Sequence, residues 1–454
     1  MALTSRQIYI TLLLLLSFST LQGQDQIYKL TFKVKTTITS DSFPVIAATK
    51  EWNSSSAFII DLTSNSNFGK TLTSGIRNGW SIFLQPNGAW GWNLGDNKRR
   101  LDYLPTTKQK INDGKWHEIT QVYDFKQEAV RLFFDNKEVA IYNWGRLEFD
   151  PTQIIENIQL SDEENLIAKG LKVEDAWVQK AIKIKNPSDT LKIVNWNIWH
   201  GGRHNGIPEG VEQTIQILED QQADIITLQE TYGSGPIIAD ALGMYFYLIS
   251  SNLSILSKFP IVGVFSPWDD FRFGGAFIKT GPEQYISVLD VWLNYLPDTH
   301  KRIQQGAGYG EILEEEIRVR GREALDMMKA YEGLGIELPT VVGGDFNSGS
   351  HLDWTIENSA IFNGYFLPWP VSRTMAREGF IDSFRSIYRN PKQNQGFTWS
   401  PRFKDVLQYR IDYIYHDQQW QTLEAGILGY EDEAWPSDHA LTWAQVALRG
   451  VVKP

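Results

Sequence analysis

The chain has 454 residues, of which 42% are hydrophobic and 21% are charged, so its composition is that of a globular protein and not of a disordered one. Its formal net charge of −11 argues against a protein that coats nucleic acid, although cations bound in an acidic cleft still allow an enzyme that acts on phosphate esters. It contains no cysteine, which excludes a disulfide framework, and its length allows two or three domains.

Residues 1–24 are expected to form a signal peptide. Arg6 supplies the positive charge before the apolar stretch of residues 8–18, which is too short to span a bilayer. Cleavage is expected near Gly23, and the alternative is a retained membrane anchor. The sequence therefore predicts a protein that is secreted, periplasmic or held at the cell surface.

Residues 25–185 have the pattern of an all-β domain. Short segments rich in aromatic and β-branched residues alternate there with turns of Gly, Asn and Asp. The expected strands include residues 27–37, 80–84, 118–123 and 130–134.

Two turns in this region carry a more specific pattern. Residues 113–117 read Asp-Gly-Lys-Trp-His, and residues 135–137 read Asp-Asn-Lys. The pair resembles the signature of laminin-G-like domains, with Asn136 where those domains have glycine, and asparagine also tolerates the positive φ of a tight turn. The resemblance implies a concanavalin-type jelly roll. Many such domains bind sugars and some bind calcium, and the alternative is a spacer or docking domain.

Residues 186–190 are rich in turn formers and are expected to be a linker, after which the hydrophobic period changes. A strand over residues 191–197, a helix over 209–222 and a strand over 223–229 predict a mixed or parallel α/β sheet. A second helix is expected over residues 311–331. Its three arginines are interpreted as a solvated face: Arg318, Arg320 and Arg322.

Several apolar β segments of residues 191–454 end in polar side chains. The most specific is Val-Val-Gly-Gly-Asp345-Phe-Asn347, because side chains two residues apart in an extended segment point the same way. Open α/β sheets bind their ligands at such strand ends. The other polar residues at strand ends are Asn197, Glu230, Asp412, Asp438 and His439.

Taken in order, these motifs resemble the endonuclease/exonuclease/phosphatase superfamily, which has the deoxyribonuclease I fold. The resemblance covers residues 191–454 and implies a four-layered α/β sandwich, in which helices flank two mixed β-sheets. It also implies cleavage of a phosphate ester with Mg²⁺ as the cofactor, or with Mn²⁺ or Ca²⁺ in its place.

The resemblance assigns one group of residues to the metal. Glu230 and Asn197 are expected to hold the cation, and Asp438 is expected to add a ligand. These side chains suit Mg²⁺, which prefers oxygen ligands and keeps several waters.

A second group is assigned to the reaction. Asp345 is expected to orient or deprotonate the attacking water, and Asn347 to donate a hydrogen bond to a phosphate oxygen. His439 is expected on the scissile phosphate. The resemblance pairs it with Asp412, which raises its pKa and favours an imidazolium that stabilises the anionic transition state.

The sequence departs from the superfamily at one position. Many members carry a His-Leu pair at the end of the strand before the Gly-Asp-x-Asn strand, and Trp292 stands here in place of the histidine. Tryptophan cannot bind a metal and donates only one hydrogen bond. We expect His200, Arg203 or His204 to supply the missing positive charge, with His300 as a weaker candidate. Alternatively, His200 only packs beside the glycine turn that follows it.

These inferences predict a secreted metal-dependent phosphoesterase that favours phosphodiesters, with a β-sandwich domain for binding or docking, for which glycans are a candidate ligand. The alternatives are a secreted nuclease, a sphingomyelinase-like phospholipid hydrolase, and, from another class, a non-catalytic carbohydrate-binding protein. The sequence shows no basic stripe with interleaved aromatic residues for nucleic acid and no basic amphipathic helix for a membrane. We therefore expect a phosphate-ester substrate, no stable nucleic-acid or membrane partner, and a monomer.

Overall fold

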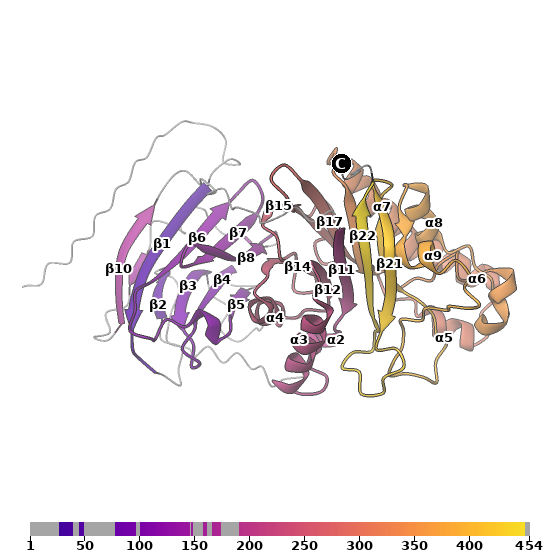
Figure 1. Cartoon of the computed structure of the whole chain (residues 1–454), viewed down its shortest axis with the longest axis horizontal. Helices are drawn as coiled ribbons and strands as arrows, with labels where there is room; N and C mark the ends of the chain where they lie inside the picture. Colours follow the sequence, from indigo (N-terminus) through magenta and orange to yellow (C-terminus); the bar gives the residue numbers. More distant parts are fainter. Residues whose placement is uncertain are drawn as a thin grey trace, which may run out of the picture. The chain divides into compact units, whose positions relative to one another are not determined.

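The computed structural model describes residues 27–39, 45–49, 78–96, 100–145, 147–148, 158–160, 166–173 and 190–449 (Figure 1). The chain divides into two compact units, one of residues 1–62 with 70–181 and one of residues 63–69 with 182–454. The predicted signal peptide lies outside the described residues, as does the predicted linker up to Thr190, which begins a strand. Among the described residues, no helix is long and apolar enough to cross a membrane.

The N-terminal unit consists of antiparallel sheets, with the short 3-10 helix η1 (Thr107–Gln109) beside them. One sheet has the order β10-β1-β6-β7-β8, and the other has the order β5-β4-β3-β2-β9. Their strands are β1 (Ile27–Thr36), β2 (Val45–Thr49), β3 (Asn78–Leu84), β4 (Trp90–Asp96), β5 (Arg100–Tyr103), β6 (His117–Asp124), β7 (Ala129–Phe134), β8 (Lys137–Asn143), β9 (Ile158–Leu160) and β10 (Leu166–Val173). The predicted all-β character of this region is confirmed for its described residues.

The core of this unit is rich in tryptophan. Trp80, Trp90 and Trp92 come from β3 and β4 and are fully buried, because both faces of these central strands are covered. Burying aromatic side chains of this size supplies much of the hydrophobic stabilisation of a small β domain.

The two laminin-G-like turns lie side by side in the structure. His117 bridges them, with its Nδ1 2.9 Å from Asp135 and its Nε2 3.1 Å from Asp113. Asn136 adopts φ 65°, which confirms that asparagine fills a turn position suited to glycine. The laminin-G-like identity of the whole unit stays a prediction.

The C-terminal unit contains two mixed sheets. The first has the order β13-β14-β12-β11-β22-β21, in which β11 and β12 are parallel, and the second has the order β15-β16-β17-β18-β20-β19, in which β17 and β18 are parallel. The strands of the first are β11 (Thr190–Asn197), β12 (Ile225–Gln229), β13 (Tyr245–Leu248), β14 (Ser254–Ser257), β21 (Trp420–Leu428) and β22 (Leu441–Leu448). Those of the second are β15 (Ile261–Phe265), β16 (Phe273–Lys279), β17 (Tyr285–Trp292), β18 (Thr340–Asp345), β19 (Ile381–Asp382) and β20 (Asp412–His416).

Helices pack against the second sheet and border the first. The apolar faces of α7 and α8 supply Met327, Met328 and Met375 to a core shared with β16, β17, β18 and β20. The helical segments of the unit are α2 (Trp199–Gly202), α3 (Glu209–Gln221), α4 (Gly235–Leu242), α5 (Thr299–Gln304), α6 (Tyr309–Glu316), the π-helix η2 (Ile317–Gly321), α7 (Arg322–Glu332), the 3-10 helix η3 (Ile356–Phe362), α8 (Pro370–Arg377) and α9 (Ser383–Ile387). The predicted mixed α/β sheets are therefore confirmed.

The solvated face predicted for residues 318–322 is wrong at Arg320. Its side chain is fully buried and forms an ion pair with the buried Glu316. It also donates to the backbone carbonyls of Asn294 and Pro297, at 2.8 and 3.0 Å. The π-helix turns this side chain inward, so Arg320 holds the loop that follows β17 and does not face solvent.

The glycine pair before Asp345 is explained by two close approaches, one to the other sheet at Gly343 and one to the neighbouring strand β17 at Gly344. A Cβ atom on Gly343 would overlap the Thr227 hydroxyl of the other sheet, and one on Gly344 would lie 2.6 Å from the Val291 carbonyl oxygen. At the same place, Asn195 donates from Nδ2 to the Gly344 carbonyl across the sheets at 3.2 Å. Glycine therefore lets polar strand ends from both sheets meet.

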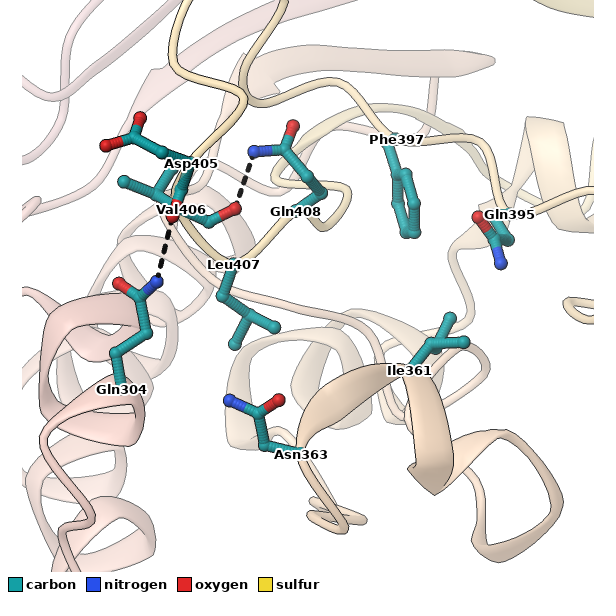
Figure 2. A pocket seen from close by; sticks show the side chains of 9 residues that line it. All are labelled: Gln304, Ile361, Asn363, Gln395, Phe397, Asp405, Val406, Leu407 and Gln408. Atoms are coloured by element: carbon teal, nitrogen blue, oxygen red, sulfur yellow. Dashed lines mark hydrogen bonds between the residues drawn. The ribbon is translucent and has the colours of Figure 1, made fainter.

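A pocket of about 390 Å³ opens in the C-terminal unit beside α5 and η3 (Figure 2). Phe397 and Leu407 form part of its apolar wall, and the amides of Gln304 and Gln408 are tied to nearby backbone carbonyls. None of the polar strand-end residues singled out from the sequence lines it.

Candidate active site

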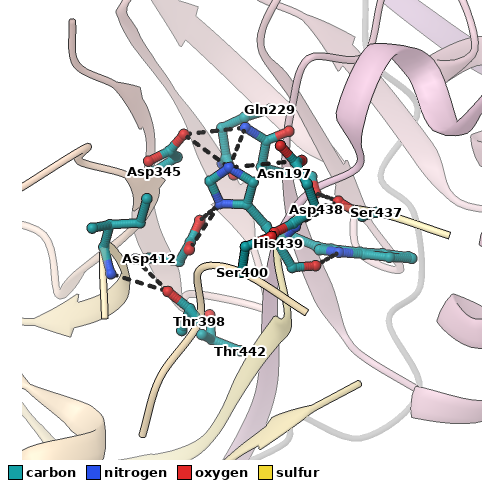
Figure 3. Close-up of polar contacts among 12 residues, drawn as sticks. Asn197, Gln229, Asp345, Thr398, Ser400, Asp412, Ser437, Asp438, His439 and Thr442 are labelled. Atoms are coloured by element: carbon teal, nitrogen blue, oxygen red, sulfur yellow. Dashed lines mark hydrogen bonds and ion pairs between the residues drawn. The ribbon is translucent and has the colours of Figure 1, made fainter. Parts of the chain in front are cut away.

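The polar strand ends of the two sheets converge on one buried cluster (Figure 3). The parallel register of β11 and β12 pairs Asn197 with Gln229, which brings Asn197 beside Glu230 at the same edge. In the second sheet, the antiparallel register of β18 and β20 pairs Asp345 with Asp412. This is the edge at which open α/β sheets place ligands.

His439 and Asp412 form the centre of the cluster. The His439 Nδ1 lies 3.0 Å from each carboxylate oxygen of Asp412, and both residues are buried. The backbone carbonyl of His439 accepts hydrogen bonds from the indoles of Trp196 and Trp435, at 2.9 and 2.8 Å. These contacts fix the ring and leave its Nε2 facing the other polar groups.

Asn197 connects the two sheets through its side-chain amide. Its Nδ2 donates to Glu230 at 3.2 Å and to Asp345 at 3.1 Å, and lies 3.5 Å from the His439 Nε2. Its Oδ1 accepts from the backbone N–H of Trp199 at 3.0 Å. In this orientation the Nδ2 of Asn197 faces the acids and its Oδ1 faces Trp199, so its predicted part as a metal ligand requires the opposite amide orientation.

Asp345 and Asn347 point to the same place, as their spacing predicts. Asn347 donates from its backbone to Asp345 Oδ1 at 2.9 Å and from its side chain to Asp345 Oδ2 at 3.1 Å. Its side chain also donates to the Leu293 carbonyl, at the end of β17, at 3.0 Å. Positive φ angles at Asn347, Glu230 and His200 concentrate backbone strain around the cluster, as is common at functional sites.

Burial of several acids sets the electrostatics of the site. It raises the pKa of Asp345 to about 7 and that of Asp438 to about 7, with His439 opposing both shifts, and it also raises the pKa of Glu230. Burial alone would lower the pKa of His439, but Asp412, Asp345 and Asp438 outweigh it and raise that pKa well above the usual range. An imidazolium is therefore favoured beside these acids.

Two separate sets of side chains offer donors for a cation. Candidate ligand atoms of Asp345, Asp412 and His439 all lie within 4.8 Å of one another. The other set is Glu230 and Asp438, and the Asp438 Oδ1 is buried without a hydrogen-bond partner among the described residues. Because a protonated His439 held by Asp412 is a poor ligand, the oxygens of Glu230 and Asp438 fit Mg²⁺ better.

The loop after β11 lies next to Glu230. The His200 backbone N–H donates to Glu230 Oε2 at 3.0 Å, and its Nε2 lies 3.6 Å from the same oxygen. Burial, together with the nearby His204, lowers the pKa of His200 to about 4, so this ring is neutral at neutral pH. Arg203 keeps its charge, and its Nε donates to Ser234 at 3.1 Å. The predicted catalytic roles of both residues stay predictions.

Trp292 lies beside Asp345 at the end of β17, where the sequence places it. Its indole is mostly buried, packs edge-on against Phe271 and lies beside Tyr295, with centroid separations of 5.7 and 6.1 Å. The Arg272 guanidinium lies 5.5 Å from the Trp292 ring centroid and forms ion pairs with Asp269 and Glu323. Trp292 is therefore mostly covered, whereas the Tyr295 ring beside it is 57% exposed.

Sequence reasoning missed the residues that support the cluster from behind. The Gln229 amide donates to the buried Asp290 at 2.5 Å, and the Thr398 hydroxyl accepts from the Asp412 backbone at 3.2 Å. The Ser437 hydroxyl donates to the Asn197 carbonyl at 2.7 Å and accepts from the His439 N–H at 3.0 Å. Among these supporting residues, only Asp290 could have been noticed in the sequence, because it is an acid inside an apolar strand.

Residues 194–439 match the model of the endonuclease/exonuclease/phosphatase family, which is more than half of the chain. The chain belongs to this family. The match begins in β11, ends at His439, and so includes every polar residue of the cluster. An uncharacterized protein of Caenorhabditis elegans is 25% identical over 262 residues, which cover 50% of this chain and 79% of that protein.

Solved structures of low sequence identity resemble a little more than half of the chain. A family protein from Bacteroides thetaiotaomicron is 15% identical, with a TM-score of 0.39, and covers 58% of this chain and 99% of its own. An AP endonuclease from Archaeoglobus fulgidus is 19% identical, with a TM-score of 0.40, and the match covers 56% of this chain and 98% of that protein. The catalytic domain of human nocturnin is 12% identical, with a TM-score of 0.39, and the match covers 57% of this chain and 95% of that domain. Family membership rests on the match over residues 194–439.

Proposed function

We propose that the chain is a divalent-metal-dependent hydrolase of phosphodiester bonds. The observation that carries this proposal is the buried His439–Asp412 pair, which lies within one hydrogen-bonded cluster with Asp345, Asn197 and Glu230. Buried acids around a protonated imidazole suit the hydrolysis of a phosphate ester, because an acid can activate the attacking water while the imidazolium neutralises the negative charge that develops on the phosphate.

Each residue near the ester has a distinct part. Asp345, whose pKa is raised to about 7 by burial, takes or orients the proton of the attacking water. Asn347 holds Asp345 in place through two hydrogen bonds. The imidazolium of His439 presents its Nε2 proton to a phosphoryl oxygen, and Asp412 fixes the ring through Nδ1.

The donor set fits a divalent cation held by Glu230 and Asp438. The Asp438 Oδ1 has no hydrogen-bond partner among the described residues, and the raised pKa values of both acids mark buried carboxylates whose charge the nearby His439 offsets only in part. When bound, Mg²⁺ supplies a Lewis acid that neutralises charge on the phosphoryl oxygens. Asn197 orients Glu230 through its amide.

The remaining expectations concern the rest of the chain. A signal peptide over residues 1–24 would export the protein to the cell surface or beyond it. The N-terminal unit would then dock the enzyme, through a laminin-G-like sandwich, to a surface such as a glycan. We further propose that the chain works as a monomer, since both sheets of the catalytic cluster belong to one unit.

The test is hydrolysis of bis(p-nitrophenyl) phosphate and of p-nitrophenyl phosphate, with Mg²⁺ and with excess chelator. We expect the diester to be the better substrate and chelator to abolish turnover. Asp345→Asn should lower the rate by at least about 100-fold. Asp417→Asn is the matched control, because Asp417 accepts from the Thr340 N–H at the opposite end of β18. Turnover that survives chelation would reject the metal, and no turnover of either ester would favour the non-catalytic alternative.

A further inference from the structure

The pocket beside α5 and η3 shares no lining residue with the catalytic cluster, so the proposed function gives it no part. Its volume of about 390 Å³ falls within the range of about 300–1,000 Å³ that is typical of small-molecule sites. Residues of the loop 395–408 form most of its lining, and residues of α5 and of η3 with its C-cap complete it (Figure 2). The pocket is therefore large enough for a ligand of its own.

One side of the pocket is apolar and firmly held. Leu407 belongs to a buried cluster of the core, and Ile361 and Phe397 pack against the same cluster. The Phe397 ring also packs edge-on against Tyr430, with a centroid separation of 5.7 Å. A fixed aromatic ring offers a flat face of partial negative charge, which attracts the C–H groups of a ligand.

Side-chain amides surround this apolar side. Two of them hold the wall in place: Gln408 donates to the carbonyls of Phe403 and Val406 at 2.8 and 2.7 Å, and Gln304 donates to the carbonyl of Asp405 at 3.3 Å. The amides that line the pocket are those of Gln304, Asn363, Gln395 and Gln408. The wall is thus arranged before any ligand arrives, which lowers the entropic cost of binding.

The other two amides are carried by fixed backbone. Asn363 ends η3 with φ 54°, and its backbone N–H donates to the Ser359 carbonyl. The Gln395 carbonyl accepts from the buried Arg385 guanidinium at 2.8 Å. Figure 2 shows the side chains of Asn363 and Gln395 at the pocket, each from a different segment. An amide both donates and accepts hydrogen bonds, so these two suit ligand groups that do the same.

The charge of the lining narrows the class of ligand. Among the described residues that line the pocket, Asp405 is the only charged one, and a carboxylate accepts hydrogen bonds but repels phosphates and other anions. A purely apolar ligand would cover the amides without replacing their hydrogen bonds to water, which costs free energy. A neutral ligand rich in hydroxyl groups, with one apolar face, matches both the amides and the Phe397 ring.

We propose that this pocket binds a neutral sugar ring. The C–H face of the sugar lies on Phe397, and its hydroxyl groups exchange hydrogen bonds with the amides of Asn363 and Gln395. The proposal is independent of the proposed function, because no residue of the catalytic cluster takes part. It also differs from glycan docking by the N-terminal unit, because the pocket belongs entirely to the C-terminal unit.

The experiment is titration calorimetry of the full chain with maltose, cellobiose and lactose, which are neutral disaccharides, and with adenosine, which is neutral but carries a flat aromatic base. The proteins are wild type, Gln395→Ala, Asn363→Gly and Gln393→Ala. Glycine at residue 363 keeps the positive φ while removing the amide. Gln393 is the matched control, because it is exposed in the same region and does not line the pocket.

We expect at least one disaccharide to bind with a Kd of about 1 mM or tighter, and excess chelator to leave this Kd unchanged. Gln395→Ala and Asn363→Gly should each weaken binding about 3- to 10-fold, as the loss of one hydrogen bond does, and Gln393→Ala should not.

Three results would overturn the proposal. The first is that none of the disaccharides binds. The second is sugar binding that Gln395→Ala and Asn363→Gly leave unchanged, which would place the sugar site elsewhere, for example in the N-terminal unit. The third is tighter binding of adenosine that both variants weaken, which would identify a site for a base. Sugar binding that depends on both amides, in a chain that hydrolyses no diester, would keep this inference and reject the proposed function.

Discussion

Asp412→Asn isolates the part that Asp412 plays through His439. In the wild type, the His439 Nδ1 lies 3.0 Å from both Asp412 oxygens, and the Asp412 charge is the largest of those that raise the pKa of this histidine. Asparagine has a similar shape and still accepts a hydrogen bond, so the change removes one charge and little packing. Asp345 and Asp438 remain, each 3.9 Å from the His439 Nε2.

The expected loss is that of one charge-assisted hydrogen bond. Such a bond contributes about 1.5–3 kcal/mol, which corresponds to a fall of about 10- to 150-fold in kcat if it acts in the transition state. The direction of the pH effect follows from the same contact. Because Asp412 raises the pKa of His439, its neutralisation should move the alkaline limb of the pH–rate profile to lower pH.

The assay is the pH dependence of diester hydrolysis, and the control is a double-mutant cycle. If Asp412 acts only through the imidazole, Asp412→Asn should cost nothing further in a His439→Ala background. Circular dichroism should show that each variant is folded. Independent, additive losses from the two changes, or an unshifted alkaline limb in Asp412→Asn, would refute the reasoning.

Three further predictions concern stability. Gly343→Ala should lower the free energy of unfolding by about 1–3 kcal/mol in urea titrations because its Cβ would meet the other sheet, whereas Gly310→Ala, with nothing within 4 Å, should not be destabilising. Arg320→Met should cost about 3–5 kcal/mol by the same measurement, since it leaves a buried carboxylate unpaired; an unchanged midpoint would contradict this. Burial raises the pKa values of Asp345 and Asp438 from 3.8 to about 7, so the folded protein binds more protons than the unfolded chain between these two pH values. The free energy of unfolding of the metal-free protein should therefore fall as the pH rises from about 4 to about 7. Calorimetry should therefore show a larger Mg²⁺-induced rise in Tm at about pH 8 than at about pH 5, and equal rises would count against these acids as the cause.

Elements with a strong local pattern were predictable from the sequence. The expected strands at residues 27–37 and 191–197 correspond to β1 and β11 within one residue, and the expected helix at 209–222 corresponds to α3. The predicted helix at 311–331 is α6, the π-helix and α7 in succession. Hydrophobic periodicity is enough for such segments, because burial of one face decides their conformation.

Arg320 marks the limit of that reasoning. An arginine on a helix is usually solvated, and the spacing of Glu316 four residues before it predicts only a surface ion pair. The sequence contains no sign that both side chains would be buried, because the carbonyls that surround Arg320 come from a loop more than twenty residues earlier in the chain. Burial of a charge is decided by such distant partners and not by local composition.

The sequence by itself determined which residues could carry the chemistry. Asn197, Glu230, Asp345 and His439 each follow or precede an apolar β segment, and strand ends leave side chains free for ligands. Only the tertiary structure decided how they act together. Gly343 lets the two sheets approach, and Asn197 of one sheet donates to Asp345 of the other. The shifted pKa values and the buried Asp438 oxygen without a hydrogen-bond partner arise from burial and from contacts between distant segments, which no local pattern encodes.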